Sequence, residues 1–145
     1  MIRRIPAIAA TCWLAACNPF DDNQVPVIAV GPGLRPVISF TPSPAYELRV
    51  YPGDQDGDRS DFIARQGLVL PAWYASGSSH YENALHSKVT YGVPPPGSEV
   101  AAAPPLTAGA NYTVTVLRKD EQGGGEGFSN TRHRYVGTHT FVASE

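Results

Sequence analysis

From position 37 onward, apolar residues alternate with polar ones at a period of two, not the period of about 3.6 that marks an amphipathic helix. Residues 37–41 (VISFT) and 46–50 (YELRV) show the alternation most clearly, and prolines and glycines interrupt it about every ten residues. Short alternating strands with regular turn signals are typical of a β-sandwich. The pattern therefore predicts an all-β fold, a single antiparallel β-sandwich. Its further strands are expected at 67–74, 88–91, 112–116 and 135–142.

The stretch before this pattern, residues 17–36, is rich in proline and glycine, which disfavour both helices and sheets. We expect it to be a tether in front of a sandwich domain at 37–145. At about 3.1 Å per residue in an extended form, the nineteen residues 18–36 would hold the domain up to roughly 60 Å from its attachment point. Residues 25–30 (VPVIAV) leave an alternative open, because this apolar run would also suit a first edge strand, where Pro26 is tolerated.

The first sixteen residues have the layout of an export signal, since Arg3 and Arg4 precede an apolar run over 5–14 that ends in small residues. The run is shorter than the roughly 20 residues that cross a bilayer. The motif Leu14-Ala15-Ala16-Cys17 closely resembles the lipobox of bacterial lipoproteins. That resemblance implies a signal peptide over 1–16, cleavage before the cysteine and attachment of diacylglycerol to its thiol. The alternative is an ordinary buried helix that ends in a core thiol.

Lipid attachment at Cys17 would decide where the protein resides. The other cysteine, Cys12, fits the motif poorly because Thr11 is not the small residue that the cut requires. Each buried methylene adds about 0.8 kcal/mol, so two or three acyl chains hold a protein on a bilayer. We therefore expect a cell-envelope protein whose membrane contact is the lipid on Cys17. Asn18 favours the outer membrane if the organism has one, since aspartate at that position is associated with inner-membrane retention in the lipoproteins that this motif resembles.

Charge and cysteine content narrow the classes of function. Removal of the signal leaves nine basic residues against thirteen acidic ones, a net charge of about −4. No basic stripe remains, so we expect no nucleic-acid partner. The mature chain keeps only Cys17, and a single domain of about 110 residues must therefore be held by its core alone.

The most specific stretch of the domain is PLTAGANYTVTV. It resembles the fibronectin type III pattern before the sixth strand, in which a leucine, a glycine turn and a tyrosine (Leu106, Gly109, Tyr112) precede alternating valines. The resemblance covers 37–143, but the chain departs from the family in its long insertion at 54–66, and the family's early tryptophan has no counterpart here unless Trp73 fills its place. It implies a fibronectin type III-like or immunoglobulin-like sandwich in which the tyrosine hydroxyl bonds to the preceding loop. Such domains mostly bind or space other domains, so we expect a non-catalytic binding or presenting module whose partner is an envelope protein or a glycan.

An acidic loop, DQDGDRSD, is the candidate metal site. Calcium takes six to eight oxygen ligands, which a cluster of carboxylates supplies. The usual calcium-loop pattern has glycine at its sixth position and glutamate at its twelfth, whereas this loop has Arg59 and Arg65 there. A solvated acidic turn between strands is the alternative. The candidate calcium ligands are Asp54, Asp56, Asp58 and Asp61.

Histidines and hydroxyls offer a rival, enzymatic interpretation. The segment GSSHYE sets Ser78, Ser79, His80 and Glu82 side by side, but it lacks the Gly-x-Ser-x-Gly turn into a helix that a nucleophile elbow needs. A small hydrolase or metal-dependent enzyme would use His80 with Glu82, or the acidic loop. Zinc binding is not expected, since no H-x-x-x-H spacing occurs. The four histidines are His80, His86, His133 and His139.

Aromatic residues gather in the middle third of the chain. If they project outward, they would form a platform for a sugar or a peptide. The alternative is that Trp73 and one or two tyrosines fill the sandwich core, because so small a domain needs its large residues inside. The candidate binding residues are Trp73, Tyr74, Tyr81 and Tyr91.

Overall fold

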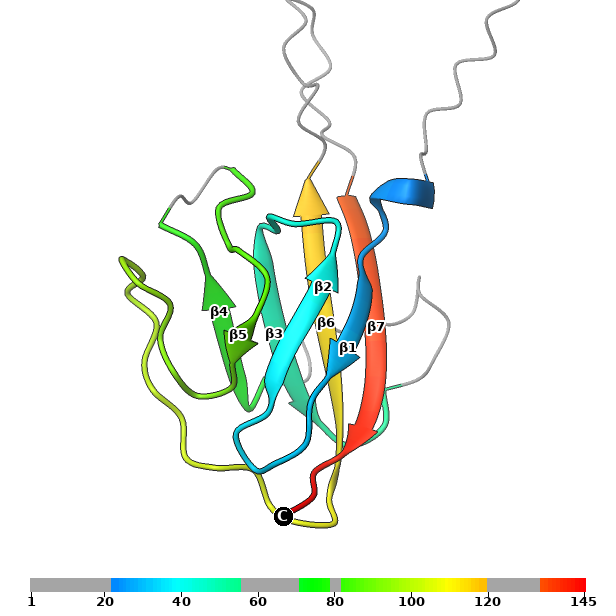
Figure 1. The fold of residues 1–145 in the computed structure, drawn as a ribbon, viewed down its shortest axis with the longest axis vertical. Helices are drawn as coiled ribbons and strands as arrows, with labels where there is room; N and C mark the ends of the chain where they lie inside the picture. The colour runs from blue at the N-terminus through cyan, green and yellow to red at the C-terminus, as the bar shows by residue number, and fades with distance from the viewer. Residues whose placement is uncertain (1–21, 56–70, 79–81, 120–133) are drawn as a thin grey trace, which may run out of the picture.

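The computed structural model describes residues 22–55, 71–78, 82–119 and 134–145 (Figure 1). These residues form two antiparallel sheets, with strand orders β1-β2-β5 and β4-β3-β6-β7, so the all-β sandwich is confirmed. None of them forms a helix long and apolar enough to cross a membrane. The elements are η1 (Asp22–Gln24), β1 (Val27–Val30), β2 (Val37–Thr41), β3 (Glu47–Pro52), β4 (Trp73–Ser76), β5 (Val89–Thr90), β6 (Asn111–Lys119) and β7 (Arg134–Val142).

The core lies between the two sheets and consists of the alternating apolar positions. Ile38 and Phe40 of β2 point inward, and their neighbours in the strand are exposed or half-buried. In the facing sheet, Leu48 of β3 lies directly opposite Val116 of the adjacent strand β6, and both are fully buried. Burial of one such side chain contributes about 1.5–3 kcal/mol, so the period-two pattern brings the sheets together by hydrophobic burial.

The predicted strands and the observed ones agree in position and differ in where they begin and end. β2 coincides with 37–41, and β3, β6 and β7 cover the other long alternating runs. β4 begins only at Trp73, and 67–70 lie outside the described residues. β5 is shorter than predicted because Lys88 has a φ of 71°, which ends an extended strand.

The first strand lies inside the segment assigned to the tether, so the domain boundary at residue 37 is too late. β1 pairs with β2 along its whole length, from Val27 opposite Thr41 to Val30 opposite Ile38. Its inward residue, Ile28, is 8% exposed and belongs to the core. The edge-strand alternative for 25–30 is therefore the one observed, because burial of an apolar side chain outweighs the proline and glycine around it.

The segment ahead of β1 is also fixed to the sandwich. Arg118 of β6 is 5% exposed; its Nε donates to the Pro44 carbonyl oxygen at 2.9 Å, and its Nη1 donates to Gln24 Oε1 at 2.5 Å. Two residues after Gln24, the Pro26 carbonyl passes so close to β7 that a Cβ on Gly137 would clash with its oxygen. Residues 22–26 thus belong to the folded domain, and β1 against β7 closes one lateral side of the sandwich (Figure 1).

Tyr112 makes the hydrogen bond that the sequence predicts. Its hydroxyl oxygen accepts from the Thr107 N–H at 3.1 Å, across the turn before β6. The ring is buried, and its centroid lies 6.0 Å from that of Phe141 on β7. Tyr112 therefore ties the 107–110 turn to the sheet.

Candidate binding groove

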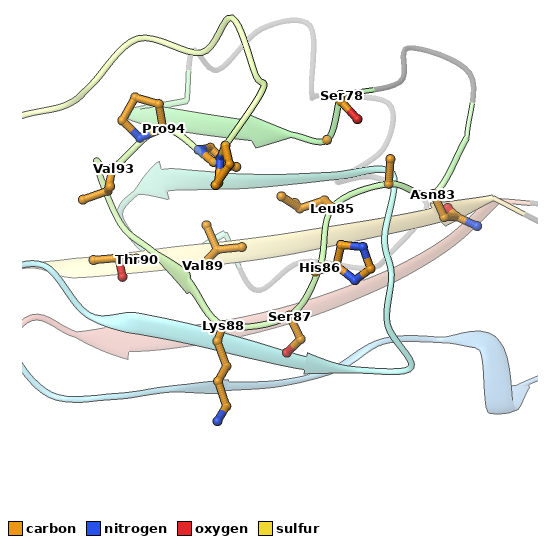
Figure 2. Close-up of a pocket in the computed structure, with 14 residues that line it drawn as sticks. Ser78, Asn83, Leu85, His86, Ser87, Lys88, Val89, Thr90, Val93 and Pro94 are labelled. Atoms are coloured by element: carbon orange, nitrogen blue, oxygen red, sulfur yellow. The ribbon is translucent and has the colours of Figure 1, made fainter.

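The opposite lateral side of the sandwich, between the outer strands β4 and β5, carries a half-open groove of about 670 Å³ (Figure 2). Ligand pockets commonly span roughly 300–1,000 Å³, so the size suits a small ligand or a few residues of a peptide. Its walls are three short segments of the described chain: 77–78 after β4, 83–90 leading through β5, and the proline turn 93–96.

One wall, the crossing segment 83–88, runs from one sheet to the other and is fixed at its start by an amide pair. Asn83 Nδ2 donates to the Lys119 carbonyl oxygen at 2.7 Å, and Asn83 Oδ1 accepts from the Lys119 N–H at 2.9 Å. Two residues on, Leu85 and Ala45 exchange backbone hydrogen bonds of 2.8 Å in both directions. The Asn83 amide thus takes the place of a backbone ladder pair with β6.

The end of the crossing segment is held by a serine. Ser87 Oγ accepts from the Phe40 N–H at 2.9 Å, and the Ser87 N–H donates to Ser43 Oγ at 3.0 Å. The next residue, Lys88, holds the left-handed backbone conformation that a side chain rarely adopts. Such a conformation costs on the order of 1–3 kcal/mol and persists only where its surroundings enforce it, as the hydrogen bonds of Ser87 do here.

The facing wall is a rigid turn. Three consecutive prolines, 94–96, have fixed φ angles and no N–H groups, and Val93 beside them is 48% exposed. The Val93 N–H donates to the Thr90 carbonyl at 3.1 Å, and Ser98 Oγ donates to the Pro95 carbonyl at 2.8 Å. Both walls are therefore set before any ligand arrives, which lowers the entropic cost of binding.

The charged side chains of the groove differ from those of the hollow next to it. His86 and Lys88 supply the groove's titratable groups, and no carboxylate occurs among its described lining residues. A second hollow of about 320 Å³ adjoins it across Gly77 and Ser78. That hollow holds Glu47 and Glu99 together with Tyr46 and Tyr74, and Glu47 is paired with Arg49 at 2.9 Å. Lys88 and Glu99 thus lie on opposite sides of the 77–78 segment, while Lys119 Nζ lies 3.2 Å from the ring centroid of Tyr46 in the second hollow.

The candidate aromatic platform does not form at two of its four positions. Trp73 and Tyr91 are 5% and 3% exposed, their rings meet edge to face with centroids 5.4 Å apart, and Trp73 Nε1 donates to the Ala101 carbonyl at 2.9 Å. Both belong to the core, as the alternative predicts, and burial raises the pKa of the Tyr91 phenol. Tyr74 is 49% exposed and lines the second hollow, while Tyr81 lies outside the described residues.

The acidic loop is described only at its first residue. Asp54 is exposed, and its Oδ1 accepts from Thr140 Oγ1 at 3.4 Å. Asp56, Asp58 and Asp61 lie outside the described residues, so calcium binding there stays a prediction. Among the residues that are described, no three His, Cys, Asp or Glu side chains gather in a way that would hold a metal ion.

The residues of the enzymatic alternative are only partly described. Ser79, His80 and His133 lie outside the described residues, as does Cys17. Ser78 lines the groove, whereas Glu82 is exposed beside it. Comparison of the chain with protein-family models, curated proteins and solved structures finds no match. The site must therefore be interpreted from its own geometry.

The groove residues His86, Ser87 and Lys88 were not among the sequence candidates for binding. No local sequence pattern indicates them, because the hydrogen bonds that hold Ser87 are made with Phe40 and Ser43, more than forty positions earlier in the chain. A lysine gives no sequence signal for a positive φ angle, because glycine and asparagine are the residues that favour it.

Proposed function

We propose that this protein is a lipid-anchored component of the cell envelope whose β-sandwich binds a partner in the lateral groove without catalysing a reaction. The sequence supports the anchor through the Leu14-Ala15-Ala16-Cys17 motif and its signal-like flank. The single observation that carries the binding role is the pre-formed groove, with both walls fixed by hydrogen bonds and prolines. The outer membrane is the proposed location where one exists, following Asn18.

A fibronectin type III-like arrangement is part of the proposal. In the strand letters used for immunoglobulin-like sandwiches, β1 to β7 are A, B, C, C′, E, F and G, and strand D is absent from this lettering. The two sheets then have the orders A-B-E and C′-C-F-G, which immunoglobulin-like sandwiches use. The Thr107 to Tyr112 hydrogen bond at the start of β6, the F strand of this lettering, supports the same assignment. Domains of this architecture host many functions, so the groove carries the binding role and the fold does not.

The position of η1 changes what the anchor would do. Five Cα steps separate Cys17 from Asp22, and at full extension they span at most about 18 Å. The tether over 17–36 would have allowed roughly 60 Å. We therefore infer a membrane-proximal domain, in place of one held far out on a stalk.

A non-catalytic role accords with the groove's polar groups. Ser87 Oγ accepts a hydrogen bond from the Phe40 N–H. The described lining of the groove includes no carboxylate that could orient the His86 ring. Nucleophilic catalysis needs a hydroxyl, a base and a group that orients the base within hydrogen-bond reach. Binding is what this set of residues supports best.

Site-directed photo-cross-linking in living cells tests the proposal. A photoreactive residue placed at position 93, on the groove wall, is expected to give discrete cross-linked bands, whereas the same residue at position 142, which is 58% exposed on β7, gives none. Labelled palmitate should enter the wild-type chain and not the Cys17→Ser chain, which should also lose the cross-links. Equal labelling of both chains would disprove the anchor, and an absence of bands at position 93 would disprove the groove as the binding site.

A further inference from the structure

We propose that the groove takes an extended peptide segment that carries carboxylate side chains. The inference rests on the binding role proposed above and names the chemical class of its ligand. It is supported by the open backbone N–H of Thr90 in β5, by the cation Lys88 at the groove, and by the shape and composition of the proline wall.

The backbone of β5 offers a place for one more strand. Tyr91 donates its N–H to the Pro36 carbonyl at 3.0 Å, and Val89 pairs with β2, so these two positions hold the ladder. Thr90 lies between them, and alternate residues of an antiparallel pair direct their backbone N–H and C=O away from the partner strand, here away from β2. The Thr90 carbonyl accepts from Val93, but its N–H meets no acceptor in the described part of the chain. An outer strand with an open donor is a template for an added peptide strand.

Charge selects an acidic peptide. Lys88 and His86 are both exposed, and the described lining of the groove includes no carboxylate. Glu82 is exposed beside the start of the crossing segment, and Glu47 and Glu99 lie in the second hollow beyond Ser78. The chain from Cys17 onward has a net negative charge, so Lys88 gives an acidic ligand a local attraction on a protein whose overall charge repels it. An exposed ion pair of this kind is expected to strengthen binding roughly 1.5- to 5-fold.

The opposite wall suits a peptide better than a glycan. Sugars bind by stacking on aromatic faces, and the described lining of the groove includes no aromatic side chain. Val93 and the prolines 94–96 form an apolar wall, while Ser87 and Thr90 line the other side. Lys88 lies at the rim of that side, and Figure 2 shows its side chain running away from Val93 and Pro94. Because successive side chains of an extended peptide point to opposite sides, one row would meet the apolar wall and the other would lie toward the rim that carries Lys88.

Peptide selection tests this specificity. The mature chain, residues 17–145, is immobilised through the Cys17 thiol, its sole cysteine, and panned with a phage library of random dodecapeptides. Counter-selection uses the Val93→Asp chain, which alters the apolar wall, and Val142→Asp serves as the exposed control. Groove-dependent peptides are expected to contain Asp and Glu at least about twice as often as the library. Amide chemical shifts of the labelled chain should move at 86–90 when such a peptide is added.

Charge variants complete the test. Lys88→Glu should weaken the selected peptides at least about twofold, while Arg134→Glu, at an exposed cation on β7, leaves them unchanged. Should Lys88→Glu unfold the chain, Lys88→Asn removes the charge and tolerates the left-handed backbone. Neutral or basic groove-dependent peptides, or none, would overturn the inference. If cross-links at position 93 still form in that case, the binding role stands and only the ligand class is wrong. If they are also absent, both proposals are wrong.

Discussion

The hydrogen bond between Tyr112 and the Thr107 N–H gives the sharpest test of the fold. Tyr112→Phe removes the acceptor oxygen and keeps the ring, which is 8% exposed and packed near Phe141. Thr107 is an exposed residue, so its freed N–H is rehydrated and the loss stays near the net value of one hydrogen bond, about 0.5–1.5 kcal/mol. At roughly 3–6 °C per kcal/mol for a domain of this size, that corresponds to a fall in melting temperature of about 2–9 °C.

Denaturant unfolding of residues 18–145 measures this difference. The midpoint should fall while the m-value stays constant, because the surface exposed on unfolding is unchanged. Tyr74→Phe is the matched control, since Tyr74 is 49% exposed and its hydroxyl bonds to nothing among the described residues. Hydrogen exchange of the Thr107 amide provides a second readout, and it should accelerate in Tyr112→Phe alone. If Tyr112→Phe matches Tyr74→Phe and leaves that amide unchanged, the hydrogen bond does not stabilise the turn and the reasoning fails.

Three further predictions test the closed edge, the core and the acidic loop. Gly137→Ala should cost about 1–3 kcal/mol in a denaturant melt, because its Cβ would meet the Pro26 backbone, whereas Gly109→Ala should cost only the roughly 1 kcal/mol of its positive φ, with no atom within 4 Å; equal costs would contradict the close approach. Burial raises the pKa of Tyr91, so the phenol ionises more readily in the unfolded chain than in the folded one. The stability that the neutral phenol contributes is complete below the unfolded pKa near 10 and should be lost as pH rises through the folded pKa. If the unfolding free energy of a Tyr91→Phe chain falls with alkaline pH in the same way as that of the wild type, this prediction is wrong. Millimolar calcium should leave the melting temperature unchanged, and a rise of several degrees that Asp56→Ala abolishes would show that the acidic loop binds the ion.

Alternation along the chain predicts the strands because each inner position is buried by the facing sheet. It fails to predict which residues on the outer face of the β3–β6 sheet are buried. The alternation places the side chains of Tyr112 and Thr113 on opposite faces of the strand. It therefore predicts that Thr113→Ala lowers the stability less than Tyr112→Phe does. Thr113 is in fact 1% exposed, and its hydroxyl accepts from the Gln55 N–H at 2.9 Å and donates to the Gly53 carbonyl at 3.0 Å. Its removal leaves two backbone groups without a partner, a loss of about 1–3 kcal/mol that equals or exceeds the cost of Tyr112→Phe.

Contacts between distant residues explain the other differences. Composition alone assigns 17–36 to a tether, because prolines and glycines dominate the local signal. The fold starts earlier because Arg118, ninety-four positions after Gln24, holds the η1 turn against the sandwich. The groove depends on pairs of the same kind, such as Asn83 with Lys119 across thirty-six positions. A single sequence carries no local pattern for such pairs, so the location of the site had to come from the structure.

The anchor and the groove together restrict where a partner can lie. Gln24 and Arg118 place η1 beside the carboxyl end of β6, and the crossing segment starts at that same end, where Asn83 meets Lys119 (Figure 1). Under the proposed lipidation of Cys17, Asp22 at this end lies within about 18 Å of the attachment point. The groove is on the lateral side of the sandwich, between β4 and β5, and so does not open through the η1 end. A partner would therefore approach alongside the domain, close to the membrane surface, and an acidic segment bound there would keep its own carboxylates beside Lys88 and away from the carboxylates of the second hollow.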